Sequence, residues 1–380
     1  MIKMIKNIME LSRVNPKLIK IFIPWVFKSP RYLISIFRLL NSYKKNEKIR
    51  ESEELKGIMI PPVLIISITS QCNLRCAGCY AVATGTVSKC STYKKNIQQQ
   101  LKSNKWIKII SEATKLGVFS FIIAGGEPFL FPDLLDICRK FKDRFFLIFT
   151  NGTALKEKHF KKLKQIANVA VIVSLEGGPR ETDSRRGRGV FKKALKTVQH
   201  LQKIGTLTGI STTITRTNYR YWIDKNFIKS LNSLGIRIAF FIEYIPTDPN
   251  DHSLILTPAE RSELRSHIIH YRRNNPIFII HSPGDEEFLG GCVSAGRGFA
   301  HITPEGDLTP CPVSNIATHN LTKSSLREGL KSVLFKEIRE KDHLLETEGM
   351  PCALFSHPKE VNEIARAIGA YRTDTRKKVT

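Results

Sequence analysis

Apolar and polar positions along the chain form blocks that predict strands and helices in alternation. Short apolar runs rich in β-branched residues predict buried strands, and the longer amphipathic stretches between them predict helices. The predicted strands are 63–69, 118–124, 145–150, 169–175, 208–215 and 236–244. The predicted helices are 97–116, 132–141, 156–166, 191–204, 219–234 and 258–273.

This succession of strand–helix units predicts the fold class. Strands that alternate with helices usually form a parallel sheet through right-handed crossovers. Six units are too few for an eight-stranded barrel, so the sequence predicts an α/β fold built as a partial (β/α)6 TIM-like barrel. Ligands of such folds bind at the carboxyl ends of the strands, where the polar motifs of this chain occur.

The segment 1–57 has a different pattern. Lys and Arg interrupt its apolar runs every few residues, and Pro16, Pro24 and Pro30 break any continuous helix. No run reaches the roughly 18–20 apolar residues that span a membrane, and the segment fits a cleavable secretory signal poorly. We expect basic amphipathic helices that either contact an anionic membrane surface or pack on the following domain with their charges in water.

Composition narrows the function classes. Hydrophobic residues make up 42% and charged residues 25% of the 380 positions, which is typical of a globular protein. The net charge of +26 would attract nucleic acid, anionic lipid or acidic proteins. Nucleic-acid binding is disfavoured because no helix-turn-helix or zinc-finger pattern is present. Eight cysteines in a chain of this length, without a secretory signal, argue against a disulfide framework.

The cysteines that follow the first predicted strand have the most informative spacing. Cys72, Cys76 and Cys79 form C-x3-C-x2-C in the loop after 63–69. Three thiolates so close together can bind three irons of a [4Fe–4S] cluster and leave the fourth iron open for a ligand. Structural zinc is the alternative, although such sites usually have four ligands in two separated pairs.

This motif resembles the hallmark of the radical S-adenosylmethionine (SAM) superfamily. The resemblance implies that Cys72, Cys76 and Cys79 hold a cluster whose open iron is chelated by SAM. Reduction then cleaves SAM to a 5′-deoxyadenosyl radical, which takes hydrogen from the substrate. One β/α unit later, Gly125-Gly126-Glu127-Pro128 stands where the superfamily binds the amino group of SAM.

Further SAM contacts are expected at the ends of the next two strands. Asn151 follows the third strand, on an edge that lines the SAM site in the superfamily. Ser174 and Glu176 end the fourth strand on one face, available to ribose hydroxyls or the methionyl group, although related enzymes often have Asp in place of Glu176. Arg186 lies in a short Arg-Gly stretch and is expected either to bind a carboxylate of SAM or substrate or to lie in a solvated loop.

The pattern changes after residue 275, and we expect a small α+β cap and tail over 276–380, with the barrel over 58–275. A hairpin is predicted to turn at 304–306, followed by a helix over about 326–339. Cys292, Cys311 and Cys352 in this region resemble an abbreviated SPASM (Twitch-like) domain, which implies an auxiliary iron–sulfur cluster. Its fourth ligand is left open among His281, His301, a carboxylate and the substrate, and structural zinc or simple packing is the alternative. Cys138 is predicted to be a buried apolar residue, and Cys90 has no assigned role.

The resemblance implies an oxidoreductase or maturase that needs a low-potential electron donor of the ferredoxin or flavodoxin type. A peptide or protein substrate is the first expectation. A membrane-associated enzyme for a lipid, isoprenoid or cofactor precursor is the second, and a non-catalytic redox module that binds SAM or iron–sulfur is the third. The expected location is the cytoplasm, with contact at the inner face of the membrane through 1–57. The sequence leaves the substrate unidentified.

Overall fold

The computed structural model describes residues 31–87, 100–246, 252–347 and 349–379. The chain divides into two compact units. The first unit contains the described parts of 1–43, 138–244 and 252–282, and the second contains those of 44–137, 245–251 and 283–380.

A parallel sheet forms the centre of the first unit. Its strands pair in the order of the sequence, and every pair is parallel. Ala170, Ile172 and Phe240 are among the buried residues of its core, and the ring of Phe149 packs edge-on against Phe240. The strands are β3 (Phe145–Thr150), β4 (Val169–Ser174), β5 (Leu207–Ile214), β6 (Ile238–Glu243) and β7 (Phe278–Ser282).

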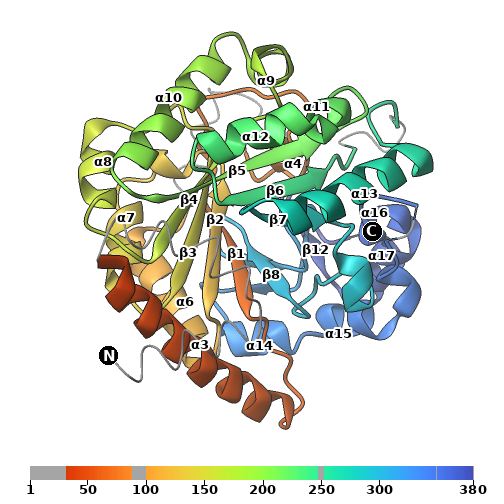
Figure 1. Cartoon of the computed structure of the whole chain (residues 1–380). Helices are drawn as coiled ribbons and strands as arrows, with labels where there is room; N and C mark the ends of the chain where they lie inside the picture. The colour runs from red at the N-terminus through yellow and green to blue at the C-terminus, as the bar shows by residue number, and fades with distance from the viewer. Residues whose placement is uncertain (1–30, 88–99, 247–251, 348, 380) are drawn as a thin grey trace. The chain divides into compact units, whose positions relative to one another are not determined.

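Helices connect these strands, as expected for parallel crossovers. Helix α10 packs on β4 and β5, and α13 packs on β7 (Figure 1). The helices are α8 (Glu157–Leu163), α9 (Pro179–Arg186), α10 (Val190–Lys203), α11 (Tyr219–Ile223), α12 (Lys225–Ser233) and α13 (Pro258–Asn274). Helix α7 (Leu134–Lys140) crosses the boundary between the units and contains Cys138, which is fully buried as predicted.

The second unit contains a sheet of mixed direction. Strand β1 pairs in parallel with β2 on one side and with β8 on the other, and β9 turns back antiparallel to β8. The predicted hairpin around 304–306 is therefore confirmed. The strands are β1 (Val63–Thr69), β2 (Ser120–Gly125), β8 (Phe299–Ile302), β9 (Asp307–Thr309) and β11 (His319–Asn320), with a separate pair β10 (Ile316–Ala317) and β12 (Tyr371–Arg372).

Short helices accompany this sheet, and most of them follow the hairpin. Those before it are α4 (Tyr80–Ala83), α6 (Ser103–Lys115) and the 3-10 turns η1 (Pro128–Leu130) and η2 (Glu286–Leu289). Those after it are α14 (Leu326–Leu330), α15 (Val333–Glu340), η3 (Asp342–Leu344), α16 (Ala353–Ser356) and α17 (Pro358–Ala367).

The described part of the N-terminal segment contains one long helix, α3 (Arg31–Glu54), which begins directly after Pro30 in the sequence. Tyr32 is fully buried, and Glu53 forms an ion pair with Arg327 (2.6 Å), so this helix is part of the fold. Pro16 and Pro24 lie outside the described residues. Within the described parts of the chain, no helix has both the length and the apolar character needed to cross a membrane.

The structure corrects several predicted elements. Strand β7 and helix α9 were not predicted, and β7 extends the parallel series beyond six strands. The helix expected over 219–234 is two helices, because Asp224 accepts a hydrogen bond from Asn226 N (2.8 Å) and starts α12 anew. The helix expected over 326–339 divides in the same way at Ser332, which caps α15.

Candidate active site

The cysteine loop begins where the buried strand β1 ends. Thr69 Oγ1 donates a hydrogen bond to Gln100 Oε1 (2.9 Å) and accepts one from Gln71 N (3.1 Å), which fixes the start of the loop. The loop ends at α4, whose first turn follows the last cysteine directly. The three predicted ligands, Cys72, Cys76 and Cys79, are each partly exposed.

The glycine loop after β2 lies against the start of the cysteine loop. Gly126 N donates to Thr69 O (2.8 Å), and Glu127 N donates to Gln71 O (2.7 Å). A Cβ atom on Gly126 would lie 2.0 Å from Gln71 O. Gly125 has φ +111°, and a Cβ atom there would lie 2.6 Å from Thr69 O. A side chain at either position would push the loops apart, so the glycines allow this contact.

Glu127 and Pro128 form the turn that follows. Pro128 occupies the first position of η1, and the fully buried Glu127 caps that turn by accepting from Phe129 N (3.1 Å). Burial raises the pKa of the Cys72 thiol to about 11, and the negative charge of Glu127 contributes to the shift. A cationic group beside Glu127 would offset this repulsion between a Cys72 thiolate and the carboxylate.

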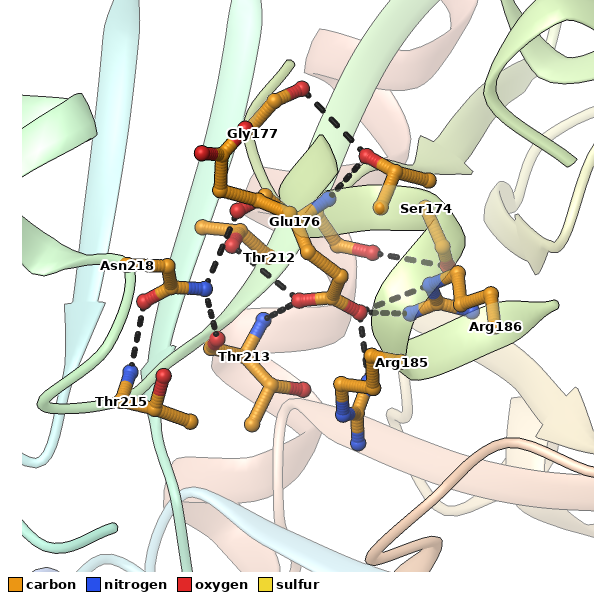
Figure 2. Close-up of polar contacts among 12 residues, drawn as sticks. Ser174, Glu176, Gly177, Arg185, Arg186, Thr212, Thr213, Thr215 and Asn218 are labelled. Atoms are coloured by element: carbon orange, nitrogen blue, oxygen red, sulfur yellow. Dashed lines mark hydrogen bonds and ion pairs between the residues drawn. The ribbon is translucent and has the colours of Figure 1, made fainter. Parts of the chain in front are cut away.

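In the first unit, Glu176 forms a buried polar cluster just beyond β4 (Figure 2). Its Oε1 accepts from Arg185 Nη1 and from Arg186 Nε (2.7 Å), and its Oε2 accepts from Thr213 N (2.9 Å). The side chain is 1% exposed. Burial alone would raise the pKa of Glu176, but the guanidinium groups of Arg186 and Arg185 outweigh it and lower the pKa. Glu176 is therefore an anion held by two cations.

Arg186 belongs to this buried cluster. The sequence predicts that its guanidinium binds a carboxylate of SAM or substrate, or lies in a solvated loop. In the structure Arg186 is largely buried at the end of α9 and binds the carboxylate of Glu176. The solvated-loop alternative is therefore wrong, because the ion pair and α9 hold the side chain in place. Ligand binding by Arg186 or Glu176 stays a prediction.

Asn151 and Ser174 also lie in the first unit, but in separate local networks. Asn151 is buried, and its Oδ1 accepts from Thr153 N (2.8 Å) and Thr153 Oγ1 (2.7 Å) in the turn after β3. Ser174 ends β4, and its hydroxyl lies 3.2 Å from that of Ser211 on β5. Both residues occur at carboxyl ends of strands, as the sequence predicts.

The three C-terminal cysteines are buried in the second unit. Burial raises the pKa of Cys292 to about 12 and that of Cys352 to about 11, and raises the pKa of Cys311 well above its usual range. Negative charge on Cys352 and Cys292 adds to the shift at Cys311, so the three sulfurs lie in one neighbourhood. The fold thus gathers cysteines from three separate stretches.

The two histidines considered as a fourth ligand have other partners. Both ring nitrogens of His301 are engaged, Nε2 with Ser67 Oγ (2.8 Å) and Nδ1 with Thr309 Oγ1 (2.8 Å). His301 therefore has no nitrogen left for an iron, and this candidate is wrong for the arrangement described. His281 Nε2 lies 3.1 Å from Glu243 Oε1.

The donor chemistry of both cysteine sets fits iron–sulfur ligation, since each offers three thiols. Within the described residues, no three His, Cys, Asp or Glu side chains already surround a common metal position. The fit therefore rests on the kind and grouping of the donors. Cys90 lies outside the described residues.

One buried polar group, at the carboxyl end of β6, was not predicted from the sequence. Glu243 Oε2 accepts from Arg261 Nε on α13 (2.7 Å), while its Oε1 faces His281 on β7. All three side chains are buried. An acidic residue at a strand end was visible in the sequence, but its partners stand 18 and 38 positions away. The pairing therefore depends on β7, which was not predicted.

Comparison with known proteins agrees with these features. The radical SAM superfamily model matches residues 66–234. The AdoMet-dependent heme synthase of Methanosarcina barkeri is 24% identical over 315 residues, which cover 75% of this chain and 86% of the relative. The mycofactocin maturase MftC of Mycobacterium tuberculosis is 26% identical over 317 residues, covering 75% and 74%.

A solved structure shows the same fold. The crystal structure of Streptococcus suis SuiB bound to S-adenosylmethionine superposes with a TM-score of 0.61 at 18% identity. The match covers 81% of this chain and 72% of SuiB. The mixed α/β fold with a parallel sheet is thus that of a partial TIM-like barrel. The matched region contains both the cysteine loop and the glycine loop, so this chain carries a radical SAM domain and is an enzyme of that kind, and such a domain implies a [4Fe–4S] cluster and SAM.

Proposed function

We propose that this enzyme modifies a peptide or protein substrate, as a maturase-type oxidoreductase. The supporting observation is the alignment of a maturase, MftC, along three quarters of this chain. The aligned length is greater than the radical SAM domain alone. In this proposal residues 58–275 are the catalytic barrel and 276–380 the cap.

The cysteine loop would hold the SAM-cleaving cluster through Cys72, Cys76 and Cys79. When bound, the cluster and SAM supply a radical that removes hydrogen from unactivated carbon. Gly125 and Gly126 keep the neighbouring backbone close to the cysteine loop, and the carboxylate of Glu127 would accept the amino group of SAM. Pro128, Asn151, Ser174, Glu176 and Arg186 complete the proposed SAM site.

The buried cysteines would hold an auxiliary iron–sulfur cluster through Cys292, Cys311 and Cys352. Because these cysteines are buried, a cluster bound to them would be enclosed by protein. Such a cluster suits electron exchange better than the binding of a ligand from solvent. Structural zinc is the alternative with the same ligands. The net charge of +26 also suits an acidic electron donor of the ferredoxin or flavodoxin type.

The first test is anaerobic reconstitution with iron and sulfide, followed by measurement of iron per chain and of 5′-deoxyadenosine formed from SAM with dithionite. We expect about eight irons per chain for two clusters and about four for one. Turnover without a peptide establishes the core reaction only. Absence of both iron and SAM cleavage would contradict the assignment of the cysteine loop.

The second test concerns the substrate. Short peptides encoded beside the gene are incubated with the reconstituted enzyme, SAM and dithionite, and their masses are compared with controls without SAM. A SAM-dependent loss of hydrogen from one peptide supports the proposal. A haem precursor is the second candidate, because the aligned heme synthase is matched along 86% of its length. Turnover of an iron porphyrin precursor of haem, but of no peptide, would favour that candidate.

Contact with an anionic membrane surface through the N-terminal segment is a further part of the proposal. Leu33 and Ile34 are exposed on α3, next to a strongly basic sequence. Because Tyr32 and Glu53 hold α3 in the fold, the variant to compare lacks only residues 1–30. We expect the full chain to co-sediment with vesicles containing phosphatidylglycerol and the shortened chain to bind them less. Equal binding by both would contradict the proposal.

A further inference from the structure

A cavity of about 230 Å³ lies within the second unit, beside the C-terminal cysteines. Cys311 and Cys352 contribute to its wall, as does α4, the helix that follows Cys79. The cavity is smaller than the roughly 300–1,000 Å³ typical of sites for whole drug-sized ligands. It therefore suits a side chain or another small group, bound beside the cluster that Cys311 and Cys352 would hold.

Arg372 lines this cavity and has only neutral partners. Its Nη2 donates to Asn362 Oδ1 (3.0 Å) and its Nη1 to Asn315 Oδ1 (3.3 Å). Within the described residues, no carboxylate forms an ion pair with it. Arg376 differs in this respect, because it pairs with the buried Asp307 (2.6 Å). The fold therefore keeps one guanidinium of this segment without a counter-ion.

The two asparagines add hydrogen-bond donors to this part of the cavity wall. Arginine can only donate, so the atom that each asparagine turns toward Arg372 is its amide oxygen. The amide NH2 groups of Asn315 and Asn362 make no hydrogen bond within the described part of the chain. Since both residues line the cavity, their amides and Arg372 together offer hydrogen-bond donors and a positive charge.

The remaining wall determines what kind of anion fits. Ile245, Leu354 and Phe355 are among the apolar residues that line the cavity. A free phosphate or sulfate would satisfy the donors but would leave these side chains without a contact. A planar carboxylate matches the arginine fork and can carry an apolar body.

We propose that this cavity binds a carboxylate attached to an apolar group, with Arg372 as its anchor and Asn315 and Asn362 as additional donors. The assignment of the carboxylate to the substrate peptide rests on the proposed function. The existence of the site does not, because it follows from the wall of the cavity.

The test is calorimetry of the full-length enzyme, reconstituted under anaerobic conditions, with 4-phenylbutyrate and its uncharged amide. We expect the wild type to bind the acid at least about tenfold more tightly than the amide, as expected for a charge-assisted pair. Arg372→Gln should lose this preference, and Arg372→Lys should keep part of it. Arg366→Gln, at an exposed position of α17, should keep it in full.

The proposal is wrong if the wild type shows no preference for the acid, or if Arg372→Gln keeps the preference unchanged. A third contrary result combines unaltered acid binding in Arg372→Gln with a shifted electron paramagnetic resonance signal of the auxiliary cluster. The last result would assign Arg372 to the cluster. If Arg372→Gln fails to fold, the partial loss of acid preference expected for Arg372→Lys tests the proposal in its place. N-acetylphenylalanine and N-acetylaspartamide then distinguish a chain terminus from an acidic side chain. Because binding is measured without turnover, its failure is separate from a failure of the peptide assay.

Discussion

The two cysteine sets are presented by the chain in opposite ways. Cys72, Cys76 and Cys79 occupy one loop and are partly exposed, and a glycine loop packs against the start of that loop. Cys292, Cys311 and Cys352 come from three stretches separated by a hairpin and several helices, and all three are buried. Each set has the same number of thiols, so the difference lies in their surroundings.

That difference indicates different tasks. A partly exposed set beside a conformationally demanding glycine loop leaves room for a ligand at the cluster, which SAM cleavage requires. Buried cysteines with raised thiol pKa values favour a metal group that is inserted once and then stays enclosed by the protein. The first set should therefore control activity, whereas the second should control iron content and stability.

The largest expected effect follows Cys76→Ala. Removal of one of three ligands should abolish the SAM-cleaving cluster, so 5′-deoxyadenosine formation should fall to the level of a control without enzyme. The matched control is Cys138→Ala, which removes a buried thiol that belongs to neither cysteine set. If both variants lose activity equally, the loss comes from the fold and the comparison fails.

Replacement of Cys292, Cys311 and Cys352 by Ala should separate the two sets. We expect iron to fall from about eight to about four per chain, while SAM cleavage without substrate continues. Metal analysis of the anaerobic protein measures both iron and zinc. Zinc that disappears with the triple replacement would instead identify a structural zinc site.

Gly126→Ala tests the contact between the glycine and cysteine loops. Its Cβ atom would lie 2.0 Å from Gln71 O, a backbone atom that cannot rotate away. We expect destabilisation of about 1–3 kcal/mol together with weaker SAM binding, measured by denaturant unfolding and by calorimetry without reductant. Gly178→Ala is the control, because its Cβ atom would meet side-chain atoms of Glu181 and Tyr221, the nearest of them 3.1 Å away. Equal effects at both positions would contradict this explanation.

The smallest effect concerns the hairpin that leads to Cys311. Burial raises the pKa of Glu305 from 4.5 to about 7. The folded protein then holds this proton more tightly than the unfolded chain, so stability is full below pH 4.5 and falls as the pH rises to 7. Glu305→Gln should remove this loss of stability. We expect it to raise the free energy of unfolding at pH 8 by at most about 3 kcal/mol, and at pH 5 by less.

Thermal unfolding of wild type and Glu305→Gln at both pH values provides the measurement. Glu363→Gln, at an exposed position of α17, is the matched control and should change little at either pH. A gain in stability that is the same at pH 5 and pH 8 would show that the charge of Glu305 is not its cause.

Prediction from the sequence succeeded where the signal was local. Val63–Thr69 and Phe145–Thr150 have the predicted strand bounds, because buried β-branched and aromatic runs specify strands directly. Strand β7 was missed because it has only five residues and begins just after Pro276, where the sequence pattern changes. The helix over 219–234 was predicted as one because a cap at Asp224 interrupts it without interrupting its apolar pattern.

The amino-acid sequence by itself determined the alternation of strands and helices from β1 to β6, the spacing of Cys72, Cys76 and Cys79, and the glycines that let the next loop approach them. These features depend on neighbours along the chain, so periodicity and residue type are sufficient. The tertiary structure decided which charges meet: Glu176 with two arginines, Glu243 with Arg261 and His281, and Arg372 with neutral asparagines. Such pairs join residues that lie nine or more positions apart, and only packing determines whether a buried charge finds a counter-ion or stays available for a ligand.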